Sequence, residues 1–472
     1  MTSYSQLELS PLQLAEVRDK TEVWILREDL LPFAFGGNKV RIAQRYIEDM
    51  RTKGKTVMIG YGSSRSNLSR VLTALCSQQK IPCSIISATD EGNMLGEAES
   101  KSFNQQLVDI LGTKVFSCSK EQVAKTIPAV KKFFCDQGDL PYFIYDPENM
   151  PAAVSAYADL VPQLLAWERT KQLHFDEIFL ACGTGTTLAG LLCGFYRAGD
   201  KRKIWGVSVA RDKAREIKVL SEDVRLWCES QKLDVFLPQE DCILDEYLCG
   251  GYGRYDDRVE NVITDLYIRR GIPLDPCYTG KAYWGMRQQL KEKCNGNKRV
   301  LFIHTGGTPL FFDFLQKKSK EKLQIVHLED NEENRLKLKN FLQKNSAEFA
   351  QPLDGRIDIA LYTEKILSKG YVFAGMQAGA IRGVVCGYAN NHFEKVAYES
   401  IFVVDKKVRG SGLARQLFEM QLVYCREQSM KTLRFNTSRG NAAAIEFYKK
   451  YSVPIDPKTC SSEKIGYEMN LE

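Results

Sequence analysis

The first 318 residues alternate short apolar runs with longer segments whose apolar residues recur at helical spacing. Thr56–Gly60 (TVMIG) is typical of a buried strand, and Asn67–Gln79 is typical of the helix that follows one. A longer helix is expected over Ala152–Arg169. Further strands are expected at Pro82–Ser87, Lys114–Cys118, Tyr142–Tyr145, Glu177–Leu180, Lys203–Val209 and Val300–His304. This repeat predicts an α/β domain with an open parallel sheet that helices cover on both faces.

The pattern changes after the charged stretch Gln316–Lys322, which is either a connection between domains or a solvated helix end. Beyond it, strands and helices no longer alternate, and three consecutive strands are expected to be antiparallel in an α+β layout. We therefore expect a first domain over 1–318 and a second over 323–472. The expected strands of the second domain are Leu323–Leu328, Gly370–Met376, Ala380–Ala389, Ala397–Val404 and Thr432–Asn436, and its helices are Asn331–Lys344, Leu413–Gln428 and Asn441–Tyr451.

Composition disfavours several classes of function. The 472 residues carry a net charge of +6 without a basic patch, which argues against nucleic-acid binding. The 14 cysteines form no CxxC pair and the 4 histidines have no metal-ligand spacing, so neither a disulfide framework nor a metal site is expected. The N-terminus is polar, and no apolar run approaches the ~20 residues of a membrane span. We expect a cytoplasmic protein without membrane contact.

Two glycine-rich segments place reactive side chains at helix starts. Gly36-Gly37-Asn38-Lys39 (GGNK) follows an apolar stretch, Phe33–Phe35, that would desolvate the lysine amine and lower its pKa. A solvated lysine is the plain alternative. In GSSRSN, Ser66 and its neighbours sit where a helix N-terminus suits a carboxylate, although Ser66 also fits a simple N-cap.

Two further segments follow strands. Cys182–Thr187 (CGTGTT) has small residues that let the backbone close around a phosphate, and threonine hydroxyls that add donors. A tight turn without a ligand is the alternative. His304–Thr308 (HTGGT) ends the last strand of the domain. Ligands of open α/β sheets bind at such carboxyl ends.

The ordered set GGNK, GSSRSNLSR, GTGTTLAGL, DPCYTGKA and HTGG resembles the D-cysteine desulfhydrase and 1-aminocyclopropane-1-carboxylate deaminase family. That family belongs to the tryptophan-synthase-β-like pyridoxal-phosphate enzymes. The resemblance covers about the first 315 residues. It implies that Lys39 carries pyridoxal 5'-phosphate (PLP) as a Schiff base and that Asn38 contacts the cofactor's ring hydroxyl.

The same resemblance implies roles for other residues. The phosphate would lie on Gly183, Thr184, Gly185, Thr186 and Thr187, with Thr279 beside the pyridine nitrogen and Thr305 in the last motif. Ser66 and Asn67 would receive the substrate carboxylate, with Ser66 also a candidate acid or nucleophile. Tyr278 and Tyr252 match tyrosines of the substrate pocket.

Some positions differ within the family. Arg65 and Leu68 replace the usual glutamine and the usual histidine or glutamine, which changes the polarity beside the carboxylate site. Arg65 would admit an extra acidic group or favour replacement over elimination. Thr279 and Thr305 stand where the deaminases have glutamate and leucine, as in the desulfhydrase branch.

The second domain has the spacing R-x-x-G-x-A at a strand–turn–helix junction, where successive N–H groups would face a pyrophosphate. Together with NAAAIEFYKKY, it resembles the GNAT acetyltransferase superfamily over about 323–472. The implied cosubstrate is acetyl-CoA, held by the backbone from Val403 to Ala414 and with Asn441 nearby. The named contacts are Val404, Arg409, Gly410, Ser411, Gly412, Leu413 and Ala414.

Two side chains of this domain are candidates for proton transfer. Tyr448 would protonate the leaving thiolate, and Glu399 is the best candidate for the general base, although a solvent-facing strand carboxylate is the plain alternative. The segment VPIDPKTC after the last helix departs from the family pattern, which leaves the acceptor pocket open.

Our leading hypothesis is a bifunctional enzyme of amino-acid metabolism, expected to be a homodimer. One domain would eliminate a β-substituent from a small amino acid such as D-cysteine, and the other would acetylate an amine. A β-replacement synthase or a racemase remains open, because the same α-proton chemistry serves all three. A non-catalytic role for one domain also remains open.

Overall fold

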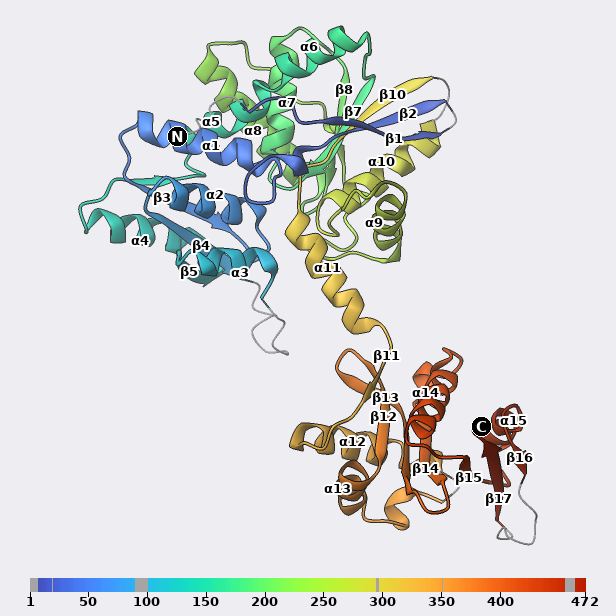
Figure 1. Ribbon diagram of the computed structural model, residues 1–472. Helices are drawn as coiled ribbons and strands as arrows, with labels where there is room; N and C mark the ends of the chain where they lie inside the picture. The colour runs from blue at the N-terminus through green and yellow to red at the C-terminus, as the bar shows by residue number, and fades with distance from the viewer. Residues whose placement is uncertain (1–6, 19, 90–100, 294–296, 350, 455–462) are drawn as a thin grey trace. The chain divides into compact units, whose positions relative to one another are not determined.

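The computed structural model describes residues 7–18, 20–89, 101–293, 297–349, 351–454 and 463–472. The chain forms two compact units, Met1–Leu315 and Gln316–Glu472 (Figure 1). Helix α11 (Thr308–Glu321) runs through the junction, so most of the charged stretch 316–322 is helical. No helix in the described ranges is both long and apolar enough to cross a bilayer.

The large sheet of the first unit has the strand order β1-β2-β10-β7-β8-β9. Strands β2, β10, β7, β8 and β9 run parallel, whereas β1 pairs antiparallel with β2 at the edge. The sequence patterns did not predict β1, β2 or the short β9. The bounds are β1 Leu12–Arg18, β2 Thr21–Leu26, β7 Glu177–Cys182, β8 Lys203–Ser208, β9 Ile243–Leu244 and β10 Lys298–Ile303.

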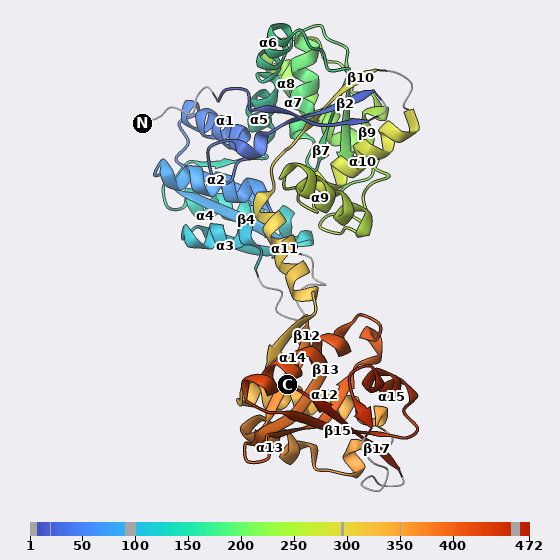
Figure 2. The same ribbon diagram turned by 45° about the vertical axis from the view of Figure 1, so that its right-hand side comes forward.

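Helices cover both faces of this sheet (Figure 2). Leu180 and its like-facing neighbours pack in the core with α5, α7 and α8, whereas Phe179 packs in a second core with α9 and α10. Strands buried on both faces explain the continuous apolar runs of the sequence. The bounds are α5 Met150–Ala158, α6 Val161–Lys171, α7 Thr186–Arg197, α8 Lys213–Gln231, α9 Asp257–Arg270 and α10 Thr279–Lys293.

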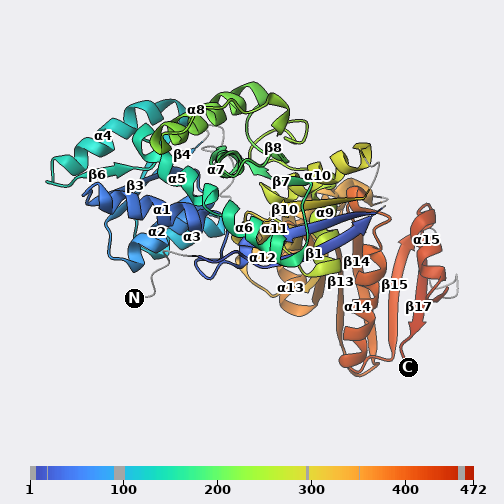
Figure 3. The ribbon, with the colours of Figure 1, turned by 90° about the horizontal axis from the view of Figure 1, so that it is seen from above.

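A smaller parallel sheet has the order β5-β4-β3-β6. Helix α4 covers one face of it, and α1 and α2 lie on the other (Figure 3). Ile59 packs toward α4, and its neighbour Met58 packs on the α1 side. The bounds are α1 Lys39–Thr52, β3 Val57–Gly62, α2 Asn67–Gln78, β4 Cys83–Thr89, α3 Phe103–Ile110, β5 Lys114–Ser119, α4 Val123–Cys135 and β6 Pro141–Phe143.

One predicted element of this unit is wrong. The single helix over Ala152–Arg169 is two helices, α5 and α6. Pro162 stands in the first turn of α6, and its ring and missing N–H prevent a continuous helix but suit a helix start.

The second unit is built on a sheet with the order β11-β12-β13-β14-β15-β17-β16. The antiparallel pairing of β12, β13 and β14 confirms the predicted strand run. Helix α13 and the terminal strand β17 were not predicted. The bounds are β11 Gln324–His327, α12 Glu332–Lys344, α13 Ile359–Lys369, β12 Tyr371–Gln377, β13 Ala380–Asn391, β14 Val396–Val404, α14 Leu413–Glu427, β15 Thr432–Ser438, α15 Ala442–Lys449, β16 Val453–Pro454 and β17 Lys464–Asn470.

Candidate functional site

The GGNK segment adopts a left-handed path before it enters α1. Ala34, Phe35, Gly36 and Gly37 all have positive φ, from 42° to 99°. Non-glycine residues rarely adopt such angles, and their strain is typical of functional loops. The run delivers Lys39 as the first residue of α1.

The first and last motifs touch through their backbones. The Asn38 N–H donates to the Thr305 carbonyl at 3.1 Å, and the Gly37 N–H donates to the Glu28 carbonyl at 2.8 Å. A Cβ on Gly306 would lie 2.5 Å from the Gly37 Cα, so glycine is required for this approach. The Thr305 carbonyl thus helps to fix the backbone next to Lys39.

Lys39 is half-buried, and burial lowers the pKa of its amine to about 8. The cause matches the desolvation expected from the sequence. Phe33 and Ala34 pack on the core, but Phe35 is 53% exposed and does not take part in the cover.

The CGTGTT segment forms the start of α7 beside this lysine. Gly185 is left-handed at φ +82° and is the N-cap residue of α7. Because it has no side chain, it does not bond the first N–H groups of that helix. Asn38 Nδ2 donates to Thr187 Oγ1 at 2.8 Å, which joins this segment to GGNK. The hydroxyls of Thr184 and Thr186 lie 3.3 Å apart.

These residues fit PLP. Gly183 lies under Tyr278, where a Cβ would come within 3.3 Å of the ring, so a side chain there would press on that ring. A helix N-terminus with two nearby hydroxyls suits a phosphate, and an amine with a lowered pKa suits the aldehyde.

Tyrosine and serine hydroxyls gather on the substrate side. Tyr252 and Tyr278 share a hydrogen bond of 2.7 Å between their hydroxyls, and Ser63 Oγ lies 3.3 Å from the Tyr252 hydroxyl. Burial raises the pKa of the Tyr278 phenol, so it keeps its proton at neutral pH, whereas Tyr252 is 37% exposed. Ser63 was not singled out from the sequence, although it stands in the quoted motif.

The two residues of the predicted carboxylate site, Ser66 and Asn67, make different contacts in the structure. Ser66 caps α2 by accepting the Ser69 N–H at 3.1 Å. Asn67 is buried, and its Oδ1 accepts from Asn104 Nδ2 at 2.9 Å. Arg65 reaches the loop that carries Tyr252, since a Cβ on Gly253 would lie 2.6 Å from Arg65 Nη1.

Thr279 is fully buried and is tied to Asp275. Its hydroxyl donates to Asp275 Oδ2 at 2.7 Å and accepts the Asp275 N–H at 2.8 Å. Burial raises the pKa of Asp275, but three backbone N–H groups also donate to it. This carboxylate was not singled out from the sequence, although the motif DPCYTGKA begins with it.

Lys281, from the same motif, is a second buried lysine. Its ammonium donates to the carbonyls of Leu248 and Gly251, both at 2.7 Å. Burial lowers its pKa. These bonds fix the loop that leads into Tyr252.

In the second unit the sheet opens between β14 and β15 (Figure 1). The two strands pair only from Val396 to Tyr398 on β14 and from Thr432 to Arg434 on β15. Beyond those residues, the described part of the chain offers β14 no strand partner on that side. Val404 lies in this stretch, and its carbonyl accepts from Arg409 Nε at 3.2 Å.

The turn after β14 opens α14 as predicted. Gly410 and Gly412 are left-handed at φ +84°, and a Cβ on either would meet open space. Gly412 caps α14 without a side-chain hydrogen bond, and the Leu413 N–H makes only a 3.4 Å contact with Ser411 Oγ. Arg409 is bound to Glu348 at 2.7 Å. Ala414 follows in the first turn.

Glu399 and Tyr448 touch each other. The Tyr448 hydroxyl donates to Glu399 Oε1 at 2.6 Å, and Gln421 Nε2 donates to Oε2 at 2.7 Å. The Tyr371 hydroxyl donates to Gln421 Oε1 at 2.9 Å. Glu399 is 5% exposed, so the alternative of a solvent-facing carboxylate is wrong. Burial raises the pKa of Glu399 to about 7.

Asn441 caps α15 by accepting the Ala444 N–H at 3.1 Å, which places Tyr448 two turns further along. Most of the unusual segment VPIDPKTC, from Ile455 onward, lies outside the described residues. The sequence did not single out Gln421 or Tyr371, because neither belongs to a motif.

Comparison with known proteins agrees with the family expected for each unit. Residues 5–306 match the family of pyridoxal-phosphate dependent enzymes, and residues 338–452 match the acetyltransferase (GNAT) family. A protein of Pyrococcus horikoshii provisionally named 1-aminocyclopropane-1-carboxylate deaminase is 29% identical over 289 residues, 61% of this chain and 84% of its own. Its namesake in Pyrococcus abyssi is 28% identical over 311 residues, 65% and 89% of the two chains.

A solved structure described as an ACC deaminase homologue is similar to the first unit. It has a TM-score of 0.57 and 27% identity, and the match covers 66% of this chain and 93% of that one. The chain therefore belongs to the pyridoxal-phosphate dependent enzymes of fold type II, with a deaminase-like first unit followed by a GNAT acetyltransferase domain.

Proposed function

We propose that the first unit eliminates the β-substituent of a small amino acid, with D-cysteine as the expected substrate. The supporting observation is the group at position 279. Thr279 offers a hydroxyl where the deaminases have a carboxylate, and the charge of Asp275 stands one hydrogen bond further away. Because electrostatic stabilisation falls with distance, the electron sink is weaker than with a carboxylate in direct contact.

A weaker electron sink suffices to remove an acidic α-proton and expel a good leaving group. Opening a strained carbon–carbon ring requires stronger electron withdrawal. PLP, when bound, draws electron density away from the substrate's α-carbon. Lys39 Nζ would take the α-proton, since its lowered pKa of about 8 leaves a larger neutral fraction than an ordinary lysine has. The Ser63–Tyr252–Tyr278 hydroxyl chain would donate hydrogen bonds to the departing β-thiolate, which takes its proton from water.

Other residues would bind and orient the substrate. The start of α2, with Ser66 and Asn67, would hold the substrate carboxylate. Gly183–Thr187 would hold the cofactor phosphate, and Asn38 would contact the ring hydroxyl. Arg65 faces the same loop as Tyr252 and would set how far a β-substituent can extend.

The test is a side-by-side steady-state assay of D-cysteine, β-chloro-D-alanine and 1-aminocyclopropane-1-carboxylate, with the Lys39→Ala variant as the blank. Pyruvate, sulfide and 2-oxobutanoate are measured. We expect pyruvate to form faster from both D-substrates than 2-oxobutanoate forms from the cyclopropane. The opposite order refutes the assignment. Turnover that requires an added nucleophile makes the unit a β-replacement synthase.

For the second unit, the proposed function is acetyl transfer from acetyl-CoA to an amine. The supporting observation is the Glu399–Tyr448 contact. Glu399 would accept the amine proton and Tyr448 would give its own to the CoA thiolate. The short hydrogen bond between them then returns the proton from Glu399 to Tyr448, so the cycle balances.

The acetyl-CoA site is tested with two matched glycine variants of the full chain. Gly412→Glu places a side chain and a negative charge at the start of α14, where the pyrophosphate would lie. Gly379→Glu makes the same change at another left-handed glycine, φ +76°, that also faces open space. Calorimetry should show no acetyl-CoA binding for Gly412→Glu and unchanged binding for Gly379→Glu. Equal affinity for both refutes the site.

A further inference from the structure

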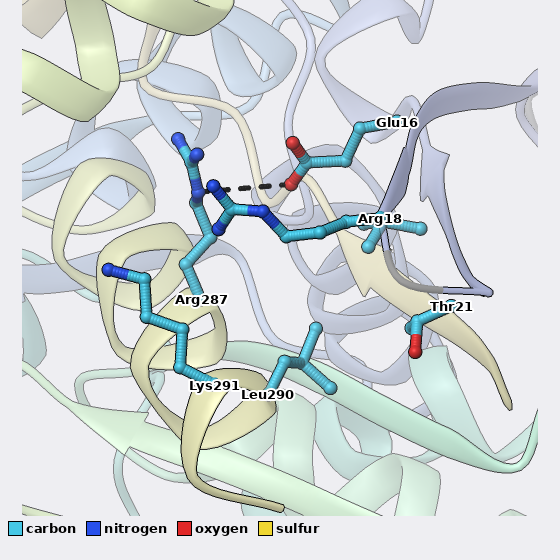
Figure 4. Close-up of a pocket in the computed structure, with 7 residues that line it drawn as sticks. Glu16, Arg18, Thr21, Arg287, Leu290 and Lys291 are labelled. Atoms are coloured by element: carbon cyan, nitrogen blue, oxygen red, sulfur yellow. Dashed lines mark ion pairs between the residues drawn. The ribbon is translucent and has the colours of Figure 1, made fainter. Parts of the chain in front are cut away.

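A cavity of about 260 Å³ lies between the β1–β2 hairpin and the last turns of α10 (Figure 4). Its lining contains three cationic side chains, Arg18, Arg287 and Lys291, against one carboxylate, Glu16. Ligand pockets generally start at about 300 Å³. The cavity therefore suits a small molecule, and none of its lining residues belongs to the sites described above.

The carboxylates near this cavity are already engaged. Glu16 accepts from the Tyr283 hydroxyl at 3.1 Å and lies 3.5 Å from Arg269 and 3.9 Å from Arg287. Asp265 pairs with the same two arginines, at 2.6 Å and 2.8 Å. Two arginines thus share two carboxylates, and this network holds Arg287 in place at the cavity wall.

Arg18 and Lys291 remain outside that network. Neither has a carboxylate within ion-pair distance among the residues that the structure describes, and both side chains are exposed. Figure 4 shows their charged groups and the Arg287 guanidinium directed toward the same space. Like charges gathered from separate elements repel one another, and an anion between them would reverse that cost.

The remaining wall is partly apolar, with Val23 and Leu290. Inorganic ions gain nothing from such a wall, whereas a carbon frame does. We propose that this cavity binds a small organic dianion, in which two phosphate or carboxylate charges are carried on a short carbon chain.

Helix α10 links the cavity to the cofactor site. It begins at Thr279, and Arg287 lies eight residues later, about 12 Å along the helix axis. A ligand that bridges Arg18 on the hairpin to Arg287 and Lys291 acts on the helix whose first residue faces the pyridine ring in the proposed function. Occupancy should therefore change the visible absorption of the bound cofactor.

The test titrates the PLP-loaded full chain with glycerol 3-phosphate and with succinate, and uses glycerol and succinamide as neutral controls. Calorimetry at low salt measures binding, and visible absorption is recorded in parallel. The Arg18→Gln/Lys291→Gln variant removes both cations. Arg51→Gln/Lys125→Gln removes two exposed cations elsewhere in the first unit.

We expect at least one dianion to bind saturably, with affinity that falls at higher salt, while both neutral compounds fail. Affinity should drop at least tenfold in the cavity variant and stay unchanged in the control variant. Phosphate and carboxylate ligands are distinguished by which probe binds. No saturable binding, or equal affinity in both variants, overturns the site, and binding without a spectral change overturns its link to α10. Loss of D-cysteine turnover alone would leave these results intact.

Discussion

The two units use glycine for different physical reasons. In the first unit, glycines let backbones touch: a Cβ on Gly306 would lie 2.5 Å from the Gly37 Cα, and one on Gly37 would lie 2.9 Å from the Thr305 carbonyl oxygen. In the second unit, Gly410 and Gly412 are left-handed but face open space. The first site is packed before any ligand arrives, whereas the second keeps room for one.

The reactive side chains of the two units, Lys39 and Glu399, also differ in their surroundings. Lys39 is half-buried, and burial alone accounts for most of its lowered pKa. Glu399 is almost fully buried, and the rise that burial causes in its pKa is opposed by hydrogen bonds from Tyr448 and Gln421. One site is assembled from loops at the ends of parallel strands, and the other from side chains within a core beside an opened sheet.

The largest effect expected is from Lys39→Ala. Turnover of D-cysteine should fall by on the order of 10³-fold or more, because the residue that carries the cofactor is lost. Acetyl-CoA binding should not change, since that site lies in the other unit. Parallel assays of sulfide release and calorimetry measure both. Retained turnover contradicts the role of Lys39, and lost acetyl-CoA binding contradicts the independence of the two sites.

Glu399→Gln should lower acetyl transfer by about 10²-fold, the usual loss when a general base is removed. In the native protein the carboxylate form is populated above its pKa, so kcat/KM should rise with pH and level off above pH 7. Tyr371→Phe, which removes only the outer hydrogen bond to Gln421, provides a milder comparison. A pH profile that is the same in Glu399→Gln and native protein excludes Glu399 as the base.

The contrast between these glycines predicts that Gly306→Ala and Gly412→Ala lower the free energy of unfolding by different amounts. At Gly306, overpacking and left-handed strain together should cost about 3 kcal/mol of unfolding free energy. At Gly412, only the strain remains, about 1 kcal/mol. Denaturant unfolding of the two variants, monitored by signals from each unit, measures the difference. Equal costs would show that the close approach of Gly37 and Gly306 does not constrain the fold.

The smallest effect concerns the pH dependence of cofactor attachment. Only the neutral amine of Lys39 attacks an aldehyde, and its neutral fraction grows as pH rises through the pKa. The rate at which cofactor-free protein takes up PLP should therefore rise to a plateau above about pH 8. Stopped-flow absorbance follows this rate. A rise that continues toward pH 10.5 means that the lysine is not desolvated.

Much of the fold was predictable because buried parallel strands leave continuous apolar runs, as at Glu177–Leu180. The helix over Ala152–Arg169 was not, because Pro162 interrupts an otherwise helical pattern. The motifs singled out Lys39, Thr187 and Tyr278 as candidates, because each stands at a fixed spacing within a short segment of the sequence. They could not give the Asp275–Thr279 pairing or the Gln421–Tyr371 bonds, which form only when distant or unremarkable residues pack together.

The most direct test of the account is where the cofactor attaches. Among the residues of the first unit that the structure describes, Lys39 and Lys281 are the lysines with a lowered pKa, and of these two only Lys281 has its ammonium bound by carbonyls. Borohydride reduction of the PLP-loaded protein, followed by peptide mass spectrometry, locates the modified lysine. The account predicts loss of the visible band and a single label on Lys39. A label on Lys281 or on any other lysine would contradict it.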